Sequence, residues 1–168
     1  MVQLYYGDGK GKTTAAVGAA VRAAGAGESV LFVSFYKDGS SSEVAALERL
    51  GVQCLFPREQ FQMFCPVTAE KQAALAADYA RLLTEIDARA ADCFLVVLDE
   101  GADAFAGDLL PRQAVLDFLQ RHGKNCEIIL TGHSLPADLA PLCDYVTRMT
   151  KERHPFDTGA PARRGIEY

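Results

Sequence analysis

A glycine-rich loop between an apolar run and an Ala-rich run most constrains the fold of this chain. Its residues are Gly7, Asp8, Gly9, Lys10, Gly11, Lys12, Thr13 and Thr14. Residues 2–6 before it are predicted to form a strand and residues 13–24 after it a helix. The glycines free backbone N–H groups to turn inward, and an anion held there faces the positive end of the helix dipole. With a charge from Lys12 and a hydroxyl from Thr13 for magnesium, the pattern predicts a triphosphate site.

This loop is one residue shorter than the usual P-loop. In the usual pattern four residues separate the first glycine from Gly-Lys-Ser/Thr, and counting back from Gly11 places Tyr6 where that glycine belongs. The altered length predicts that the phosphates lie differently from those in a standard ATPase. The alternative is an ordinary glycine turn that opens a helix, which the Gly-Lys-Thr-Thr context disfavours.

The composition excludes several classes of protein. A chain of 168 residues is long enough for one well-buried α/β domain. Its 22 acidic and 17 basic side chains give a net charge of -5, which argues against a nucleic-acid partner. No apolar run approaches the ~18 residues that span a membrane, so we expect a cytoplasmic protein with no membrane partner. Five scattered cysteines without a Cys-x-x-Cys pair indicate neither a zinc site nor a disulfide framework.

Strand-like and helix-like segments alternate along the rest of the chain. Further strands are predicted at 29–36, 52–56, 94–98, 127–131 and 145–149. Further helices are predicted at 69–90, 111–123 and 136–144, with a short one that a Ser40–Glu43 capping box begins and Gly51 ends. Gly18 is expected to let the first helix approach the sheet. The pattern predicts an α/β fold, a single P-loop NTPase-like domain with a mostly parallel central sheet and helices on both faces.

Two carboxylates follow the strand predicted at 94–98. Asp99 and Glu100 sit at the end of a continuous apolar run, where a parallel strand delivers its residues to the ligand side of a sheet. Beside a P-loop, such a carboxylate can hold magnesium while Thr13 takes another coordination place. The alternative is an acidic pair that marks where a strand meets solvent. Asp103 and Asp108 are expected to be solvated charges or caps.

Two other positions have alternative interpretations. Phe61 and Phe64 lie in an irregular segment, 57–68, where they either fill the core beneath a long loop or cover an apolar ligand. His133 follows the strand at 127–131 and either meets phosphate or substrate or hydrogen-bonds within its loop. By composition alone, the tail from Lys151 to Tyr168 would be a solvated terminus.

Taken together, four motifs resemble the P-loop family of ATP:corrinoid adenosyltransferases. They are the short loop, Val-Val-Leu-Asp-Glu, Ile-Leu-Thr-Gly-His and the terminal His-Pro-Phe-Asp-x-Gly followed by Arg-Arg-Gly-Ile-Glu-Tyr. The resemblance runs almost the whole length, 1–168, and implies that the tail, 151–168, contributes to the site. It implies transfer of the 5′-deoxyadenosyl group of ATP to Co(I) of a corrinoid such as cob(I)alamin, release of triphosphate, and a homodimer.

The resemblance also suggests roles for particular residues. Lys12, Lys10, the loop N–H groups and Mg²⁺ at Thr13, Asp99 or Glu100 would neutralise the leaving triphosphate. Asp8 would lie near the nucleotide. His133, Arg163 and Arg164 are assigned to the same site.

The family is understood to pack aromatic side chains against the lower face of the corrin. Its members carry Gly-Phe-Thr-Trp in this region, whereas this chain has no tryptophan, and Phe61 and Phe64 are the candidates for that role. An electron donor of the flavin reductase or flavodoxin type is the expected partner. Two alternatives stay open: a P-loop nucleoside kinase or ATPase, and a non-enzymatic module that binds corrinoid or nucleotide.

Overall fold

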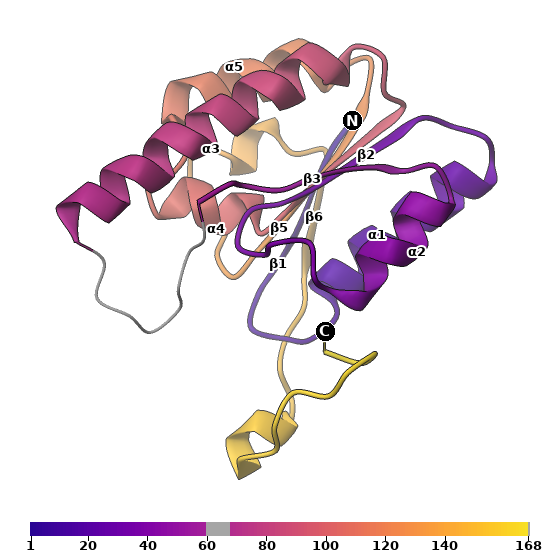
Figure 1. Ribbon diagram of the computed structural model, residues 1–168, viewed down its shortest axis with the longest axis vertical. Coiled ribbons are helices and arrows are strands. Elements are labelled where there is room, and N and C mark those ends of the chain that lie inside the picture. The colour runs from indigo at the N-terminus through magenta and orange to yellow at the C-terminus, as the bar shows by residue number, and fades with distance from the viewer. Residues whose placement is uncertain (60–67, 168) are drawn as a thin grey trace.

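Six strands form the central sheet of the computed structural model, which describes residues 1–59 and 68–167. They are β1 (Val2–Tyr6), β2 (Val30–Ser34), β3 (Gln53–Leu55), β4 (Leu95–Asp99), β5 (Glu127–Gly132) and β6 (Tyr145–Arg148). Their order is β3–β2–β4–β5–β1–β6, and all the pairings between these strands are parallel (Figure 1). The predicted α/β class is therefore confirmed, and the carboxyl ends of all six strands meet at one edge of the sheet.

Helices cover both faces of this sheet (Figure 1). On one face lie α1 (Lys12–Gly25) and α2 (Ser42–Arg49), and on the other lie α3 (Ala69–Ala90), α4 (Gly101–Ala106) and α5 (Arg112–His122). Because β2 and β4 are buried on both sides, their side chains alternate between two apolar clusters. Phe32 packs with Ala16 and Ala20 of α1, whereas Leu31 and Val33 pack in the cluster that includes α3 and α5.

The structure differs from the sequence prediction in two segments on one face of the sheet. Residues 101–106, for which no helix was predicted, form α4, because Ala102, Ala104 and Phe105 are buried in the core. The prediction of a helix at 136–144 is wrong, since that segment holds only the short 3₁₀ turn η1 (Ala140–Leu142). Pro141 lies within this turn and has no N–H to extend a helical ladder.

Two smaller differences concern α1 and α2. The N-cap of α2 is Ser41, and its side chain makes no capping hydrogen bond within the described part of the chain. Ser40 instead donates its backbone N–H to Asp38 Oδ1 at 3.0 Å, which closes a turn before the helix. Gly18 is exposed on α1, so it is not the point where this helix approaches the sheet.

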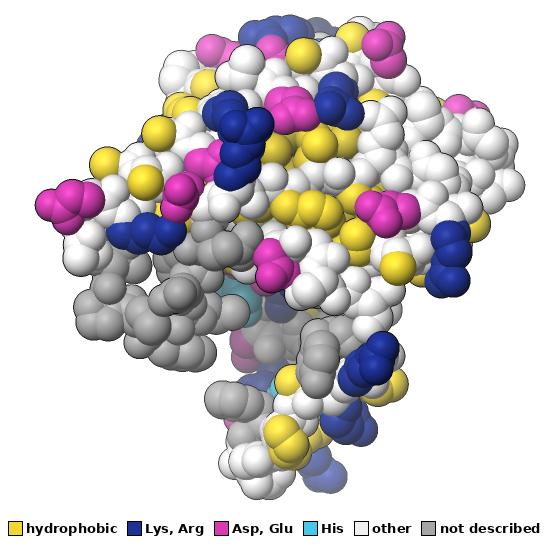
Figure 2. Space-filling view, in the orientation of Figure 1, with side chains coloured by type: hydrophobic (Ala, Val, Ile, Leu, Met, Phe, Trp, Pro, Cys, Tyr) yellow, Lys and Arg dark blue, Asp and Glu magenta, His cyan; other side chains and the backbone are white. Residues whose placement is uncertain are grey.

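None of the helices in the described residues is both long enough and apolar enough to cross a lipid bilayer. The longest, α3, is amphipathic, with Leu75, Tyr79, Leu82, Leu83 and Ile86 buried on one side. Both charge signs are interspersed over the helical part of the surface in the space-filling view (Figure 2).

The glycine loop packs directly on the residue that follows β6. Gly9 donates its backbone N–H to the carbonyl oxygen of Met149 at 2.9 Å. Gly7 has φ +119°, and a Cβ added there would lie 2.2 Å from the same oxygen. A side chain at Gly7 would therefore be strained in its backbone and would also collide with the neighbouring strand.

We expect Gly7→Ala to lower the free energy of unfolding by about 1–3 kcal/mol from backbone strain alone, with the collision adding to this. Gly18→Ala is the matched control. A Cβ at Gly18 meets no described atom outside its own helix within 4 Å, so that change should raise the free energy by about 0.5–1 kcal/mol. Urea denaturation followed by circular dichroism measures both, and equal stability of the two variants would contradict the packing.

Candidate functional site

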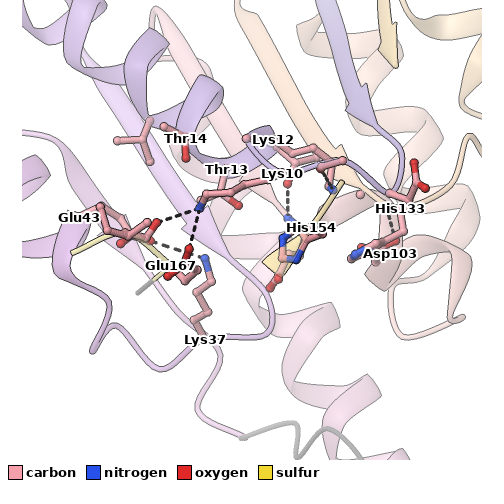
Figure 3. A pocket seen from close by; sticks show the side chains of 18 of the residues that line it. Lys10, Lys12, Thr13, Thr14, Lys37, Glu43, Asp103, His133, His154 and Glu167 are labelled. Atoms are coloured by element: carbon pink, nitrogen blue, oxygen red, sulfur yellow. Dashed lines mark hydrogen bonds and ion pairs between the residues drawn. The ribbon is translucent and has the colours of Figure 1, made fainter. Parts of the chain in front are cut away.

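A cavity of about 550 Å³ opens at the carboxyl edge of the sheet. It lies where the glycine loop, the ends of β4 and β5, the start of α2 and the C-terminal segment converge (Figure 3). Figure 2 shows the C-terminal segment extending from the body of the domain at the bottom of the view. The cavity is lined by Asp8, Gly9, Lys10, Gly11, Lys12, Thr13, Thr14, Val17, Lys37, Ser42, Glu43, Glu100, Asp103, Thr131, Gly132, His133, His154, Gly165, Ile166 and Glu167.

Within the loop, Lys12 lies across its own backbone. Its ammonium donates to the carbonyl oxygens of Gly7 at 2.7 Å and Gly9 at 2.9 Å. Burial lowers the pKa of Lys12, although the surrounding carboxylates oppose that shift. The N–H groups of Gly7 and Gly9 donate to the carbonyls of Gly132 and Met149. The N–H groups left for an anion are therefore those later in the loop and in the first turn of α1, which have no intrahelical acceptor.

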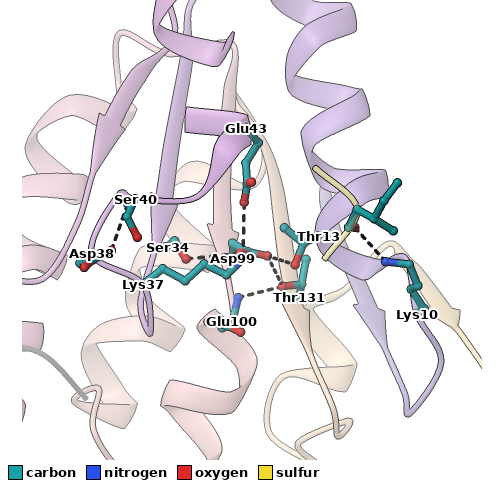
Figure 4. Close-up of polar contacts among 11 residues, drawn as sticks. Lys10, Thr13, Ser34, Lys37, Asp38, Ser40, Glu43, Asp99, Glu100 and Thr131 are labelled. Carbon is teal, nitrogen blue, oxygen red and sulfur yellow. Dashed lines mark hydrogen bonds and ion pairs between the residues drawn. The ribbon is translucent and has the colours of Figure 1, made fainter. Parts of the chain in front are cut away.

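The carboxylate of Asp99 is fully buried and hydrogen-bonded on both oxygens (Figure 4). Oδ1 accepts from the hydroxyls of Thr13 and Thr131, each at 2.8 Å. Oδ2 accepts from the Ser34 hydroxyl at 3.3 Å and from the Lys37 ammonium at 3.2 Å. Asp99 thus holds the P-loop hydroxyl in place, and its own oxygens are already occupied by protein donors.

Glu100 differs from Asp99 in having a carboxylate oxygen without a hydrogen-bond partner among the described residues. This oxygen, Oε2, is buried. Burial, followed by repulsion from Asp99, raises the pKa of Glu100 to about 7. Its backbone is left-handed, with φ 60°, a conformation that costs a non-glycine residue about 1–3 kcal/mol. Its N–H donates to Thr131 Oγ1 at 2.8 Å, which helps to hold this conformation.

Lys37 and Glu43 belong to the same cluster, although the sequence prediction did not include them. The Lys37 ammonium lies 3.5 Å from Glu43 Oε1, in addition to its contact with Asp99. Burial alone would lower the pKa of Lys37, but attraction to Asp99, Glu100 and Glu43 outweighs it and raises that pKa. The available signal was position, since Lys37 closely follows the carboxyl end of a buried strand, as Glu100 and His133 do.

These residues fit a hard divalent cation. The Thr13 hydroxyl and the unpartnered Glu100 Oε2 are oxygen ligands of the kind that Mg²⁺ prefers, and both residues line the cavity. Within residues 1–59 and 68–167, no group of three or more His, Cys, Asp and Glu side chains is arranged to hold a metal ion. A cation here would therefore need further oxygens from a bound phosphate or from water.

His133 lies at the cavity beside α4. Asp103 Oδ1 accepts its backbone N–H at 2.8 Å, and Asp103 Oδ2 lies 2.7 Å from its Nδ1. The His133 side chain is 71% exposed, whereas that of Asp103 is 17% exposed. Asp103, expected to be a solvated charge or a cap, instead orients the imidazole toward the cavity. His154 also lines this cavity, although the sequence prediction did not assign it a role.

The C-terminal segment reaches back to the glycine loop. Lys10 donates to the carbonyl oxygen of Ile166 at 3.0 Å and lies 3.6 Å from Glu167 Oε1. Arg163 forms an ion pair with Glu167 at 3.0 Å and holds the pKa of that carboxyl down to about 2. Residues 165–167 line the cavity, whereas Arg164 lines a second one beside Phe56 and the turn before α2. The loop residues are thus brought together with the tail, but Arg163 and Arg164 are not part of the cavity lining.

The corrin-facing candidates Phe61 and Phe64 lie outside the described residues. The chain just before them is attached to α3. Asp78 Oδ2 accepts the backbone N–H groups of Arg58 at 2.5 Å and Glu59 at 2.8 Å.

The parallel sheet, the glycine loop that opens α1 and the acidic end of β4 define a P-loop nucleotide-binding protein. The model of the ATP:corrinoid adenosyltransferase family BtuR/CobO/CobP matches residues 1–168, and the chain belongs to this family.

Several curated relatives agree with this assignment. Corrinoid adenosyltransferase CobA of Salmonella typhimurium is 35% identical over 181 residues, which cover 100% of this chain and 85% of that protein. Corrinoid adenosyltransferase of Escherichia coli is 31% identical, with the same two coverages. That of Pseudomonas aeruginosa is 29% identical over 98% of this chain and 82% of its own length.

The raised pKa of Glu100 predicts a pH-dependent stability of the metal-free protein. Between pH 4.5, the ordinary value, and about pH 7, the folded state keeps a proton that the unfolded state releases. The free energy of unfolding therefore falls as the pH rises through this window, by at most about 2–3 kcal/mol. Glu100→Gln removes this contribution, so the variant should become more stable relative to the parent between pH 5 and pH 8.

Urea denaturation at both pH values, with a chelator present, measures this difference. Glu28→Gln makes the same change on an exposed side chain and serves as the control. If the difference between Glu100→Gln and the parent did not grow with pH, the buried carboxyl would not be the source of the effect.

Proposed function

We propose that this protein transfers the 5′-deoxyadenosyl group of ATP to the Co(I) of a reduced corrinoid and releases inorganic triphosphate. The observation that carries the proposal is the match to the ATP:corrinoid adenosyltransferase family over residues 1–168. The site geometry supports it, because the glycine loop, the acidic strand end and the tail that carry the family motifs line one cavity.

The reaction needs charge neutralisation more than proton transfer. Co(I) attacks the ribose 5′ carbon, a cobalt–carbon bond forms, and the carbon–oxygen bond breaks with its electron pair going to the triphosphate. Lys12 and Lys10 supply positive charge beside the loop that would hold the triphosphate. The Lys12 ammonium now donates to two loop carbonyls, and a bound phosphate would offer it stronger, charged acceptors.

We assign Mg²⁺ to the Thr13 hydroxyl and Glu100, where it would supply further positive charge to the phosphates. The open Oε2 of Glu100 favours this residue as a direct ligand. The carboxylate of Asp99 is fully hydrogen-bonded, which favours a role in orienting Thr13. His133, held by Asp103, is placed to donate to a phosphate or to the nucleoside.

The short loop also suits this chemistry. Gly7 and Gly9 donate their N–H groups to the carbonyl oxygens of Gly132 and Met149, so we expect the phosphates to lie nearer residues 10–14. An ATP molecule whose triphosphate is held in this position would present its ribose 5′ carbon, instead of its γ-phosphorus, to a nucleophile.

The decisive experiment is an anaerobic assay with ATP, Mg²⁺, a chemical reductant and cob(II)alamin or cobinamide. A light-sensitive adenosylcorrinoid formed together with triphosphate would support the transferase. Diphosphate and phosphate with an unchanged corrinoid would indicate a kinase or ATPase instead. Binding of ATP and corrinoid without any turnover would favour a non-enzymatic module.

In that assay, Lys12→Ala should reduce kcat by about 10²–10³-fold, because its charge matters most as the triphosphate leaves. Lys124→Ala, which removes the same charge from an exposed turn, is the control and should turn over normally. Isothermal titration calorimetry with ATP should show a smaller effect on binding than on rate. Parent-like turnover by Lys12→Ala would refute the role of this lysine.

Phe64→Ala tests the corrinoid contact proposed for Phe61 and Phe64. Loss of an aromatic side chain that packs against the corrin should reduce the formation of Co(I) by about tenfold or more, while the affinity for ATP stays near that of the parent. The absorption spectrum of the corrinoid measures the formation of Co(I). Phe61→Ala should have the same effect. Phe94→Ala is the control, because Phe94 is 47% exposed. A Phe64→Ala variant that unfolds would instead place Phe64 in the core.

We further propose a cytoplasmic homodimer that receives its electron from a flavin reductase or a flavodoxin-type protein. An exposed edge strand supports association of two copies, since β6 lies at the end of the sheet order and all four of its residues are exposed, with Tyr145 at 51% and Val146 at 45%. Analytical ultracentrifugation tests the dimer. The electron donor follows from the reaction, because the corrinoid must be reduced to Co(I).

A further inference from the structure

Lys37 differs from the other two lysines that line the cavity. The Lys12 ammonium lies on loop carbonyls and that of Lys10 on the C-terminal segment. The Lys37 ammonium instead lies against the candidate metal site, 3.2 Å from Asp99 and 3.5 Å from Glu43. Its side chain is 28% exposed, while that of Asp99 is fully buried. Lys37 therefore supplies positive charge at the place where a divalent cation is expected.

We propose that Lys37 is a tethered cation that balances the buried carboxylates of the nucleotide-free protein and opposes metal binding until ATP arrives. This inference rests on the proposed function for the metal site itself. It goes beyond that function by making Lys37 the residue that couples entry of the metal to entry of the nucleotide.

The electrostatics of the empty cavity support this role. A buried carboxylate needs a counter-charge, and Lys37 provides one for Asp99. The same ammonium repels any dication that approaches Thr13 and Glu100. The described side chains alone also offer too few ligands, because they contain no ready group of three metal-binding residues. Metal binding without nucleotide is thus opposed both by charge and by the small number of ligands.

The triphosphate of ATP changes both the charge of the site and the number of metal ligands. Its oxygens complete the ligand set of the metal, and its negative charge attracts the metal and the lysine together. Lys37 lines the cavity on a flexible four-carbon stem, so it can turn toward the phosphates. Asp99 then keeps the hydroxyls of Thr13, Thr131 and Ser34 as donors.

A purely structural ion pair is the competing explanation. In that case, removing Lys37 would destabilise the fold, because Asp99 would be left without its counter-charge, but would not tighten metal binding. Metal affinity in the absence of nucleotide therefore separates the two explanations.

The test uses Mn²⁺ as the probe, without corrinoid and in the presence or absence of ATP. Because ATP itself chelates Mn²⁺, the free metal measured by electron paramagnetic resonance is compared with a matched titration that lacks the protein. Without ATP, Lys37→Met and Lys37→Gln should bind Mn²⁺ at least tenfold more tightly than the parent. Lys37→Gln keeps an N–H donor for Asp99 and protects against a failure to fold. Lys37→Arg keeps the charge and should bind as the parent does, and Lys124→Met is the remote charge control. With ATP, the advantage of the neutral variants should disappear.

Thermal unfolding provides a second measurement. Mn²⁺ should raise the melting temperature of Lys37→Gln more than that of the parent in the absence of ATP, because tighter binding to the folded state stabilises it more. Unchanged or weaker Mn²⁺ affinity in both neutral variants, with the parent still binding Mn²⁺ in the presence of ATP, would overturn the role of Lys37 and leave the proposed function intact. No Mn²⁺ binding by the parent with ATP would overturn both.

Discussion

The buried carboxylate of Asp99 is the interaction on which the architecture of the site depends. Through Thr13 it contacts the first turn of α1, through Thr131 it contacts β5, and through Ser34 it contacts β2. These segments are far apart in sequence but end at one edge of a parallel sheet. In a low-dielectric interior, a charge that accepts hydrogen bonds on both oxygens fixes its donors in place. The P-loop hydroxyl is therefore positioned by the core of the sheet as well as by its own helix.

Local sequence features predicted the half of the site that is built from neighbouring residues. The loop from Gly7 to Thr14 has a pattern that only a strand–turn–helix unit explains. Asp99 and Glu100 follow an apolar run that is continuous because it is buried on both faces. In each case the prediction rests on a few adjacent residues, and the parallel topology brings the two motifs to one edge of the sheet.

The other half depends on contacts between distant segments, which periodicity cannot show. Lys37 and Glu43 join the cluster only because the turn after β2 folds over Asp99. Helix α4 is too short for a clear period, and its burial depends on the strand beside it. Conversely, Pro141 was a local signal against the helix predicted at 136–144. The tail looked solvated because its partner, Lys10, is at the opposite end of the chain.

The position of β1 has a consequence for how the chain folds during synthesis. This strand lies between β5 and β6, so Gln3 pairs with Ile129 on one side and with Tyr145 on the other. At a ribosomal rate of about 5–20 residues per second, these partners emerge many seconds after β1. The first strand and the glycine loop therefore stay unpaired while residues 7–126 are made. The sheet closes only after β5 and β6 have been synthesised, so a slow, non-local folding step is built into this strand order.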